Sequence, residues 1–106
     1  MKEQRHYQRL KFGFQIEDIN GKKTWMTEDI SVGGCFIKAL EDMPVGSKIN
    51  LAFQIPGSPK YINALGEVKH LQERGMGIEF INVETKKRNE MGLFIKQFLK
   101  FQDKDL

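Results

Sequence analysis

Hydrophobic and polar residues alternate along most of the chain, which is the pattern of β-strands that turn one face to a core. Near the N-terminus, hydrophobic side chains occupy every second position, at Leu10, Phe12, Phe14 and Ile16. Lysine, glycine and other polar residues stand between them. Because successive strand side chains point to opposite faces, this spacing predicts a first strand with one buried face.

Five further segments have strand character and are separated by residues that favour turns. They are residues 22–29, 35–40, 49–55, 61–71 and 75–81. Asn20-Gly21, between the first two strands, is a strong hairpin signal because both residues tolerate a positive φ. Six short strands joined by tight turns predict an antiparallel barrel or sandwich, and a barrel leaves no sheet edge exposed.

From about residue 83 the hydrophobic period changes from that of a strand to that of a helix. The apolar residues that share one helical face are Met91, Phe94, Ile95, Phe98 and Leu99. We expect Asn82 to be the N-cap, and Lys86, Lys87 and Arg88 to lie on the polar side. The phenylalanines either pack over an end or a side of the β-structure or face a partner protein.

The composition changes this picture little, but the position of the charge adds to it. The chain has 106 residues, 40% of them hydrophobic and 29% charged, as in one ordinary globular domain spanning 1–106. The formal charge of +3 is small for a protein that grips long nucleic acid. The excess lies within residues 1–11, because the acids and bases of the remaining chain cancel. Residues 1–9 are thus a basic arm, either a solvated tail or an anion-binding segment.

Several classes of protein are disfavoured by the same residues. A single cysteine, Cys35, cannot form an internal disulfide, and no Cys/His cluster suggests a metal site. No apolar run reaches the roughly 20 residues of a transmembrane helix, and the polar N-terminus lacks a signal peptide, so we expect a cytoplasmic protein. His6 and His70 stand in no catalytic spacing. We therefore expect neither an enzyme nor a bound cofactor.

Two short motifs remain to be explained. The first is Arg5-His-Tyr-Gln-Arg9, just before the first strand, and the second is Asp29-Ile-Ser-Val-Gly-Gly34, at the end of the second. Separately, the first is an ordinary charged arm and the second an ordinary turn held by side-chain hydrogen bonds. Together, with a hairpin between them, they resemble the RxxxR and [DN]xSxxG motifs of the PilZ domain family. Residues 66–70 and 75–80 also resemble that family's closing strands.

The resemblance runs from about Gln4 to Phe101 and implies both a fold and a ligand. The implied fold is mainly β, a six-stranded antiparallel barrel over 10–81 that follows the arm and precedes a C-terminal helix over 83–101. The implied ligand is the bacterial second messenger cyclic di-GMP. Its contacts would be Arg5, Arg9, Asp29, Ser31 and Gly34, with Gln4, His6 and Gly33 as candidate secondary contacts.

The chemistry of these residue types suits a ligand with two phosphates and two guanines. A guanidinium can donate two parallel hydrogen bonds to guanine O6 and N7 or to phosphate oxygens. The Asp29 carboxylate can accept from guanine N–H groups, and the Ser31 hydroxyl can donate or accept. Gly34 suits a sharp turn or a close approach to the ligand. Gln4 replaces an arginine that many family members carry, which leaves open whether one ligand or an intercalated pair binds.

We therefore expect a cyclic di-GMP receptor that relays binding, as a conformational change, to a downstream effector protein. One alternative is a PilZ-like interaction module that acts without nucleotide. A less favoured one is an oligonucleotide-binding barrel of the OB type, for which exposed aromatic side chains would be needed as stacking surfaces. The phenylalanines of the predicted strands alternate as core residues instead.

Overall fold

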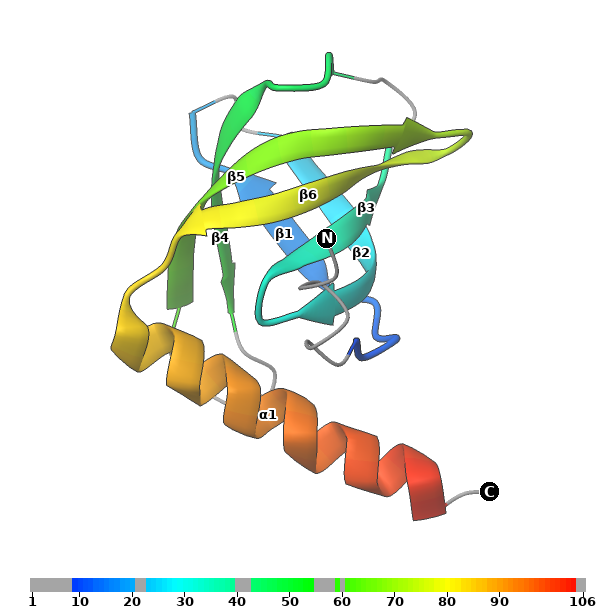
Figure 1. The fold of residues 1–106 in the computed structure, drawn as a ribbon, viewed down its shortest axis with the longest axis vertical. Helices are drawn as coiled ribbons and strands as arrows, with labels where there is room; N and C mark the ends of the chain where they lie inside the picture. The colour runs from blue at the N-terminus through cyan, green and yellow to red at the C-terminus, as the bar shows by residue number, and fades with distance from the viewer. Residues whose placement is uncertain (1–8, 21–22, 40–42, 55–58, 60, 105–106) are drawn as a thin grey trace.

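The computed structural model describes residues 9–20, 23–39, 43–54, 59 and 61–104, the side chains of 100–104 excepted. Within them the elements are β1 (Gln15–Asp18), β2 (Lys23–Ser31), β3 (Gly34–Lys38), β4 (Lys48–Gln54), β5 (Tyr61–Gln72), β6 (Gly75–Asn82) and α1 (Thr85–Lys104). The strands pair antiparallel in the order β1-β2-β3-β6-β5-β4 and close into a barrel (Figure 1). The predicted six-stranded barrel with a C-terminal helix is confirmed.

The core of the barrel consists of the alternate side chains that point inward from each strand. Among the largest buried residues are Ile16, Ile30, Ile37, Leu51, Ile62, Val68 and Met76. Each aliphatic side chain of this kind stabilises the fold by about 1.5–3 kcal/mol when it leaves water. Phe53 and Phe80 are also buried, so these rings belong to the core as the alternation predicted. For Phe36 on β3 that prediction is wrong, because its ring lies outside the core and is partly exposed.

The first strand is shorter than the hydrophobic alternation predicted. Residues 11–14 do not pair as a strand, and the reason is the buried side chain of Thr27 on β2. Its hydroxyl donates to the Phe12 carbonyl at 2.9 Å and accepts from the Phe14 N–H at 3.1 Å. The Thr27 N–H also donates to the Phe14 carbonyl at 3.0 Å, so one side chain and one backbone bond hold this segment to β2 in place of a regular ladder. The prediction of a continuous strand from Leu10 to Ile16 is wrong over its first half, and regular pairing begins at Gln15.

The barrel closes between β1 and β4 over a short seam. Among the described residues, only Glu17 with Ala52 and Asp18 with Leu51 are paired there, and the Ile19 N–H donates to the Asn50 carbonyl at 2.9 Å. By contrast, β4 and β5 pair over seven residues. The seam is the least extensively paired part of the barrel wall.

Helix α1 begins later than predicted. Asn82 is the last residue of β6, so the prediction that it caps the helix is wrong. The Arg88 N–H donates to the Glu84 carbonyl at 2.9 Å, which places the helix start just after Glu84. A strand residue keeps extended backbone until its ladder ends, and the pairing of Asn82 with Leu65 holds it there. Among the described residues, no helix is long and apolar enough to cross a membrane.

The apolar face of α1 lies across one end of the barrel (Figure 1). Met91 and Ile95 are buried, and the Phe94 and Phe98 rings lie 6.0 and 5.2 Å from the ring of Phe12. Phe94 and Phe98 therefore pack on the protein itself, at the segment that follows the N-terminal arm. Of the two alternatives for these phenylalanines, packing on the β-structure or facing a partner protein, the first holds for Phe94 and Phe98.

Candidate functional site

Arg9, the last residue of the RxxxR motif, lies beside Asp29, the first residue of the second motif. Leu10 and Ile30 exchange two backbone hydrogen bonds, at 2.8 and 2.9 Å, which bring the two segments together. The Arg9 Nε and Nη2 groups then donate to Asp29 Oδ1 at 3.1 and 2.8 Å. Both bonds end on one carboxylate oxygen. Among the described residues, neither Asp29 Oδ2 nor Arg9 Nη1 has a hydrogen-bond partner.

A bulge in β2 directs Asp29 to this position. Thr27 and Ile30 both point into the core although they are three residues apart, which strict alternation does not allow. The register with β3 shifts between Thr27 and Asp29, so Glu28 is the extra residue. A bulge of this kind redirects the side chains around it. Asp29 consequently lies at the surface, with 21% of its side chain exposed.

The turn between β2 and β3 is held by Ser31. Its side chain is buried, its hydroxyl accepts from the Gly33 N–H at 3.2 Å, and it donates to the Gly34 carbonyl at 3.4 Å. Hydroxyl-to-backbone bonds of this type shape turns. The observed role of Ser31 is to build the turn that borders the site, in addition to any contact with a ligand.

Gly34 is required by the packing of two strands. It pairs with Glu79 of β6, and a Cβ at this position would overlap the Ile78 carbonyl oxygen and lie 3.2 Å from the Glu79 Cα. Gly46, and not Gly34, is the described glycine with a positive φ. Glycine stands at position 34 because β3 and β6 approach closely, which is a different reason from the sharp turn or ligand approach that the sequence suggested.

These residues line a groove with a volume of about 630 Å³. This lies within the roughly 300–1,000 Å³ of small-molecule sites. Five of the residues predicted from the motifs and their surroundings share the groove: Arg9, Asp29, Ser31, Gly33 and Gly34. Arg5 and the secondary candidates Gln4 and His6 lie outside the described residues.

The groove also contains residues that the motifs did not indicate. Those with charged side chains, or with aromatic side chains that are at least partly exposed, are Lys11, Glu28, Phe36, Lys69, His70, Glu79 and Arg88. His70 lies on β5, and its side chain is exposed in the groove. Sequence spacing could not indicate these groove residues, because strand pairing and helix packing bring them there.

Phe36 and His70 form an aromatic surface across three strands. Phe36 on β3 and His70 on β5 both neighbour Gly77 on the intervening strand β6. Their rings are 6.3 Å apart and tilted by only 27°. A Cβ on Gly77 would overlap the His70 ring, so the missing side chain lets the imidazole lie over β6. The His70 side chain is exposed and that of Phe36 is partly buried, and aromatic faces beside charged groups are suited to stacking on a nucleobase.

Cys35 borders the groove, but its thiol is unreactive near neutral pH. Its side chain is fully buried, and burial together with the nearby Asp29 charge raises the pKa of the thiol from 9.0 to about 12. The thiolate is the reactive form, so this cysteine is not a nucleophile near neutral pH. In the part of the chain that the structure describes, no group of three or more His, Cys, Asp or Glu side chains is arranged to hold a metal ion.

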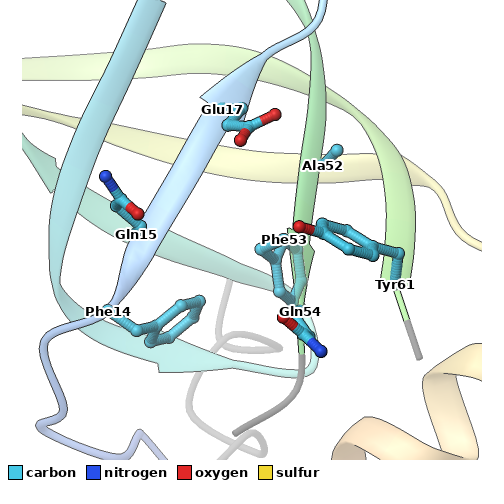
Figure 2. A pocket seen from close by; sticks show the side chains of 7 residues that line it. All are labelled: Phe14, Gln15, Glu17, Ala52, Phe53, Gln54 and Tyr61. Atoms are coloured by element: carbon cyan, nitrogen blue, oxygen red, sulfur yellow. The ribbon is translucent and has the colours of Figure 1, made fainter. Parts of the chain in front are cut away.

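A second, smaller pocket of about 180 Å³ lies at the seam between β1 and β4 (Figure 2). Its walls are mainly aromatic, amide and small side chains, and Phe14 and Phe53 pack there with their rings 5.5 Å apart. Glu17 is the charged residue of its lining. The pocket follows from the short β1–β4 pairing, because the strands are no longer paired beyond Glu17 and Ala52.

The comparisons with known proteins identify the relatives of this chain. Residues 3–97 match the family described as PilZ domain. The fold resembles the Bacillus subtilis inhibitor of motility MotI/DgrA, with a TM-score of 0.83 at 14% identity, over 93% of this chain and 51% of that one. It also resembles YcgR from Escherichia coli, solved in complex with c-di-GMP, with a TM-score of 0.76 at 15% identity, over 93% and 47%.

At these identities the two likenesses show a shared fold. This chain spans about half the length of either solved protein. No curated protein was found to match it.

Proposed function

Since the chain belongs to the PilZ domain family, we propose that it binds cyclic di-GMP in the groove beside Arg9 and Asp29. The observation that carries this proposal is the direct pairing of the two motifs. Arg9 and Asp29 are 20 residues apart in sequence and hydrogen-bonded in space. A second support is YcgR, a protein of the same fold that was solved with this nucleotide.

The pair of Arg9 and Asp29 offers complementary groups to a guanine nucleotide. Arg9 Nη1 can donate to guanine O6 or N7 or to a phosphate oxygen, and Asp29 Oδ2 can accept from the guanine N–H groups. Nearly half of the Arg9 side chain is exposed, so its bond to Asp29 contributes at most about 1 kcal/mol. A ligand can therefore share or replace that bond at little cost. Arg5 is proposed to complete the arm's contacts with Arg9.

The remaining walls of the groove suit the rest of the nucleotide. Phe36 and His70 present aromatic faces, and stacking of a base on such a face is worth about 1–3 kcal/mol. Lys11, Lys69 and Arg88 add positive charge, which favours phosphates. We infer that the bases lie over β6 and that the phosphates face the cations.

The proposed relay to an effector protein begins at the arm. Phe12 follows Arg9 by three residues and packs on Phe94 and Phe98 of α1. A ligand that reorders the arm would change this contact and thus the surface that the helix offers to a partner. Residues 1–106 would act in this way as a single cytoplasmic receptor domain, without catalysis and without a cofactor.

Titration calorimetry of the full chain with cyclic di-GMP, and with cyclic di-AMP as the control, tests the proposal. We expect heat of binding at micromolar protein for the guanine ligand and much weaker binding of the adenine ligand, because adenine lacks the N–H pattern that Asp29 accepts. Absence of heat with cyclic di-GMP would overturn the proposed ligand. Binding that leaves the NMR signals of the arm unchanged would overturn the proposed relay.

A further inference from the structure

Beyond the two motifs, we propose that Arg88 of α1 is a ligand contact. Its guanidinium binds a phosphate of the nucleotide and thereby connects ligand occupancy to the helix. This inference rests on the proposed function, because it assigns a further residue to the same groove. It adds an element, the C-terminal helix, that contributes no residue to the RxxxR or DxSxxG motif.

The packing of α1 places Arg88 next to the turn that carries the second motif. A Cβ built on Gly92 would lie 3.7 Å from Val32 Cγ2, an ordinary packing distance, so this face of the helix rests on the turn between β2 and β3. Arg88 precedes Gly92 by four residues, and residues four apart share one face of a helix. Arg88 consequently lines the same groove as Arg9, Asp29 and Gly33.

Arg88 differs from the other cations of the groove in its ion-pair partners. Arg9 is paired with Asp29, and Lys69 lies 3.3 Å from Glu79 and 3.7 Å from Glu67. Lys11 also has an interaction within the molecule. No carboxylate pairs with Arg88 among the residues that the structure describes. An anion can therefore reach its guanidinium without displacing a carboxylate of the described residues.

The chemistry of the side chain indicates a phosphate. A guanidinium presents a planar fork of donors that matches two phosphate oxygens, and such charged, bidentate bonds are stronger than neutral ones. Asp29, in contrast, carries the acceptors that distinguish guanine from adenine. Loss of Arg88 should accordingly weaken binding without changing the preference for the base.

A ligand held between Arg9 and Arg88 would bridge the barrel and the helix. The segment that follows the arm already touches α1 through Phe12, whose ring packs on Phe94 and Phe98. The nucleotide would add a second connection nearer the start of the same helix, since Arg88 lies in its first turn and Phe94 and Phe98 lie further along it. Ligand binding is thus expected to stabilise the N-terminal part of α1 against local opening.

Calorimetry of the full chain with cyclic di-GMP tests this assignment in four proteins: wild type, Arg88→Ala, Arg88→Lys and Lys86→Ala. Lys86 is exposed in the same helical turn and is outside the groove lining, so its variant removes the same charge without the contact. We expect Arg88→Ala to bind about tenfold more weakly, as for the loss of a charged hydrogen bond, Arg88→Lys to recover part of the affinity, and Lys86→Ala to change it less than about twofold. The ratio of cyclic di-GMP to cyclic di-AMP affinity should be unchanged in Arg88→Ala.

Hydrogen exchange at saturating ligand gives the second readout. In the wild type the amides of residues 88–92 should exchange more slowly with ligand, whereas in Arg88→Ala the protection should be confined to the barrel. Equal losses in Arg88→Ala and Lys86→Ala, or wild-type affinity in Arg88→Ala, would overturn the contact while leaving the proposed function intact. If the wild type itself does not bind, both proposals fail.

Discussion

The barrel has two hollows that differ in almost every property relevant to a ligand. The groove at β2, β3, β5 and β6 has a volume of about 630 Å³. Its lining holds four cations, from the segment before β1, from β5 and from α1, together with the carboxylates of Glu28, Asp29 and Glu79. The pocket at the seam of β1 and β4 has about 180 Å³, and the described residues that line it include Glu17 but no cation (Figure 2). Both are formed where regular strand pairing is interrupted.

The difference shows that an irregularity in the barrel is not sufficient for a phosphate site. At the seam, short pairing leaves a space next to Phe14 and Phe53. At the groove, the bulge at Glu28 and the turn held by Ser31 place Asp29 opposite an arginine. Positive charge and directed hydrogen-bonding groups distinguish the two, and the following predictions test that distinction.

The largest effect is expected when the wall of the groove is forced apart. In Gly34→Ala the new Cβ would meet the Ile78 carbonyl across β3 and β6, and overpacking of this kind costs about 3 kcal/mol. We expect a corresponding loss in the free energy of unfolding, measured with denaturant, and a loss of ligand binding.

Gly92→Ala is the matched control for that variant. Its Cβ would make only ordinary contact with Val32, and alanine is favoured over glycine in a helix by up to about 1 kcal/mol. The control should therefore keep or raise stability. A Gly34→Ala protein as stable as the wild type would contradict the close approach of β3 to β6.

The next largest effect concerns ligand affinity. Arg9→Ala should weaken cyclic di-GMP binding about tenfold or more, because charged hydrogen bonds contribute about 1.5–3 kcal/mol. Glu17→Gln, in the seam pocket, removes a charge from the other hollow and should leave the affinity within about twofold. Calorimetry measures both. If the two variants lose affinity equally, the proposal that the ligand binds in the groove and not in the seam pocket is wrong.

A smaller effect is expected from the buried wall of the groove at high pH. The unfolded chain loses the Cys35 proton above about pH 9.0, whereas in the folded protein the thiol keeps it until about pH 12. The unfolded state therefore binds fewer protons in this window, and stability falls by up to about 1.4 kcal/mol per pH unit as the pH rises. Denaturant unfolding between pH 8 and 11 should show this extra slope in the wild type and not in Cys35→Ala. Identical slopes would mean that Cys35 is accessible to solvent.

The smallest effect is expected at the seam. Tyr61 lines that pocket and is 52% exposed, so Tyr61→Ala should change the free energy of unfolding by no more than about 0.5 kcal/mol. Cyclic di-GMP affinity should remain at the wild-type value. A clear loss of affinity in the calorimeter would show that the two hollows are coupled.

Much of the fold could be predicted because it depends on local patterns. Alternation along residues 49–55 and 61–71 identified inward residues such as Leu51 and Ile62, since a strand has the same two faces wherever it pairs. The first strand was predicted too long because Thr27, distant in sequence, bonds the backbone at Phe12 and Phe14. Asn82 was misassigned as a cap because pairing with Leu65 extends β6 to that residue.

The residues of the candidate site also fall into two groups, those that the sequence could predict and those that it could not. Arg9 and Asp29 were recognised because the two short motifs that contain them, taken together, resemble those of the PilZ domain family, and each motif spans only a few consecutive residues. His70 and Arg88 could not be recognised, because one reaches the groove through the pairing of β5 with β6 and the other through the packing of α1 on the turn at Val32.

The sequence by itself thus determined the inward and outward faces of the strands, the helical segment and the two motifs, all of which depend on near neighbours in the chain. Only the tertiary structure decided that Arg9 pairs with Asp29, that Gly34 serves the approach of β3 to β6, and that α1 borders the groove. These features arise from contacts between segments far apart in sequence, and barrel closure selects those contacts by packing rather than by local preference.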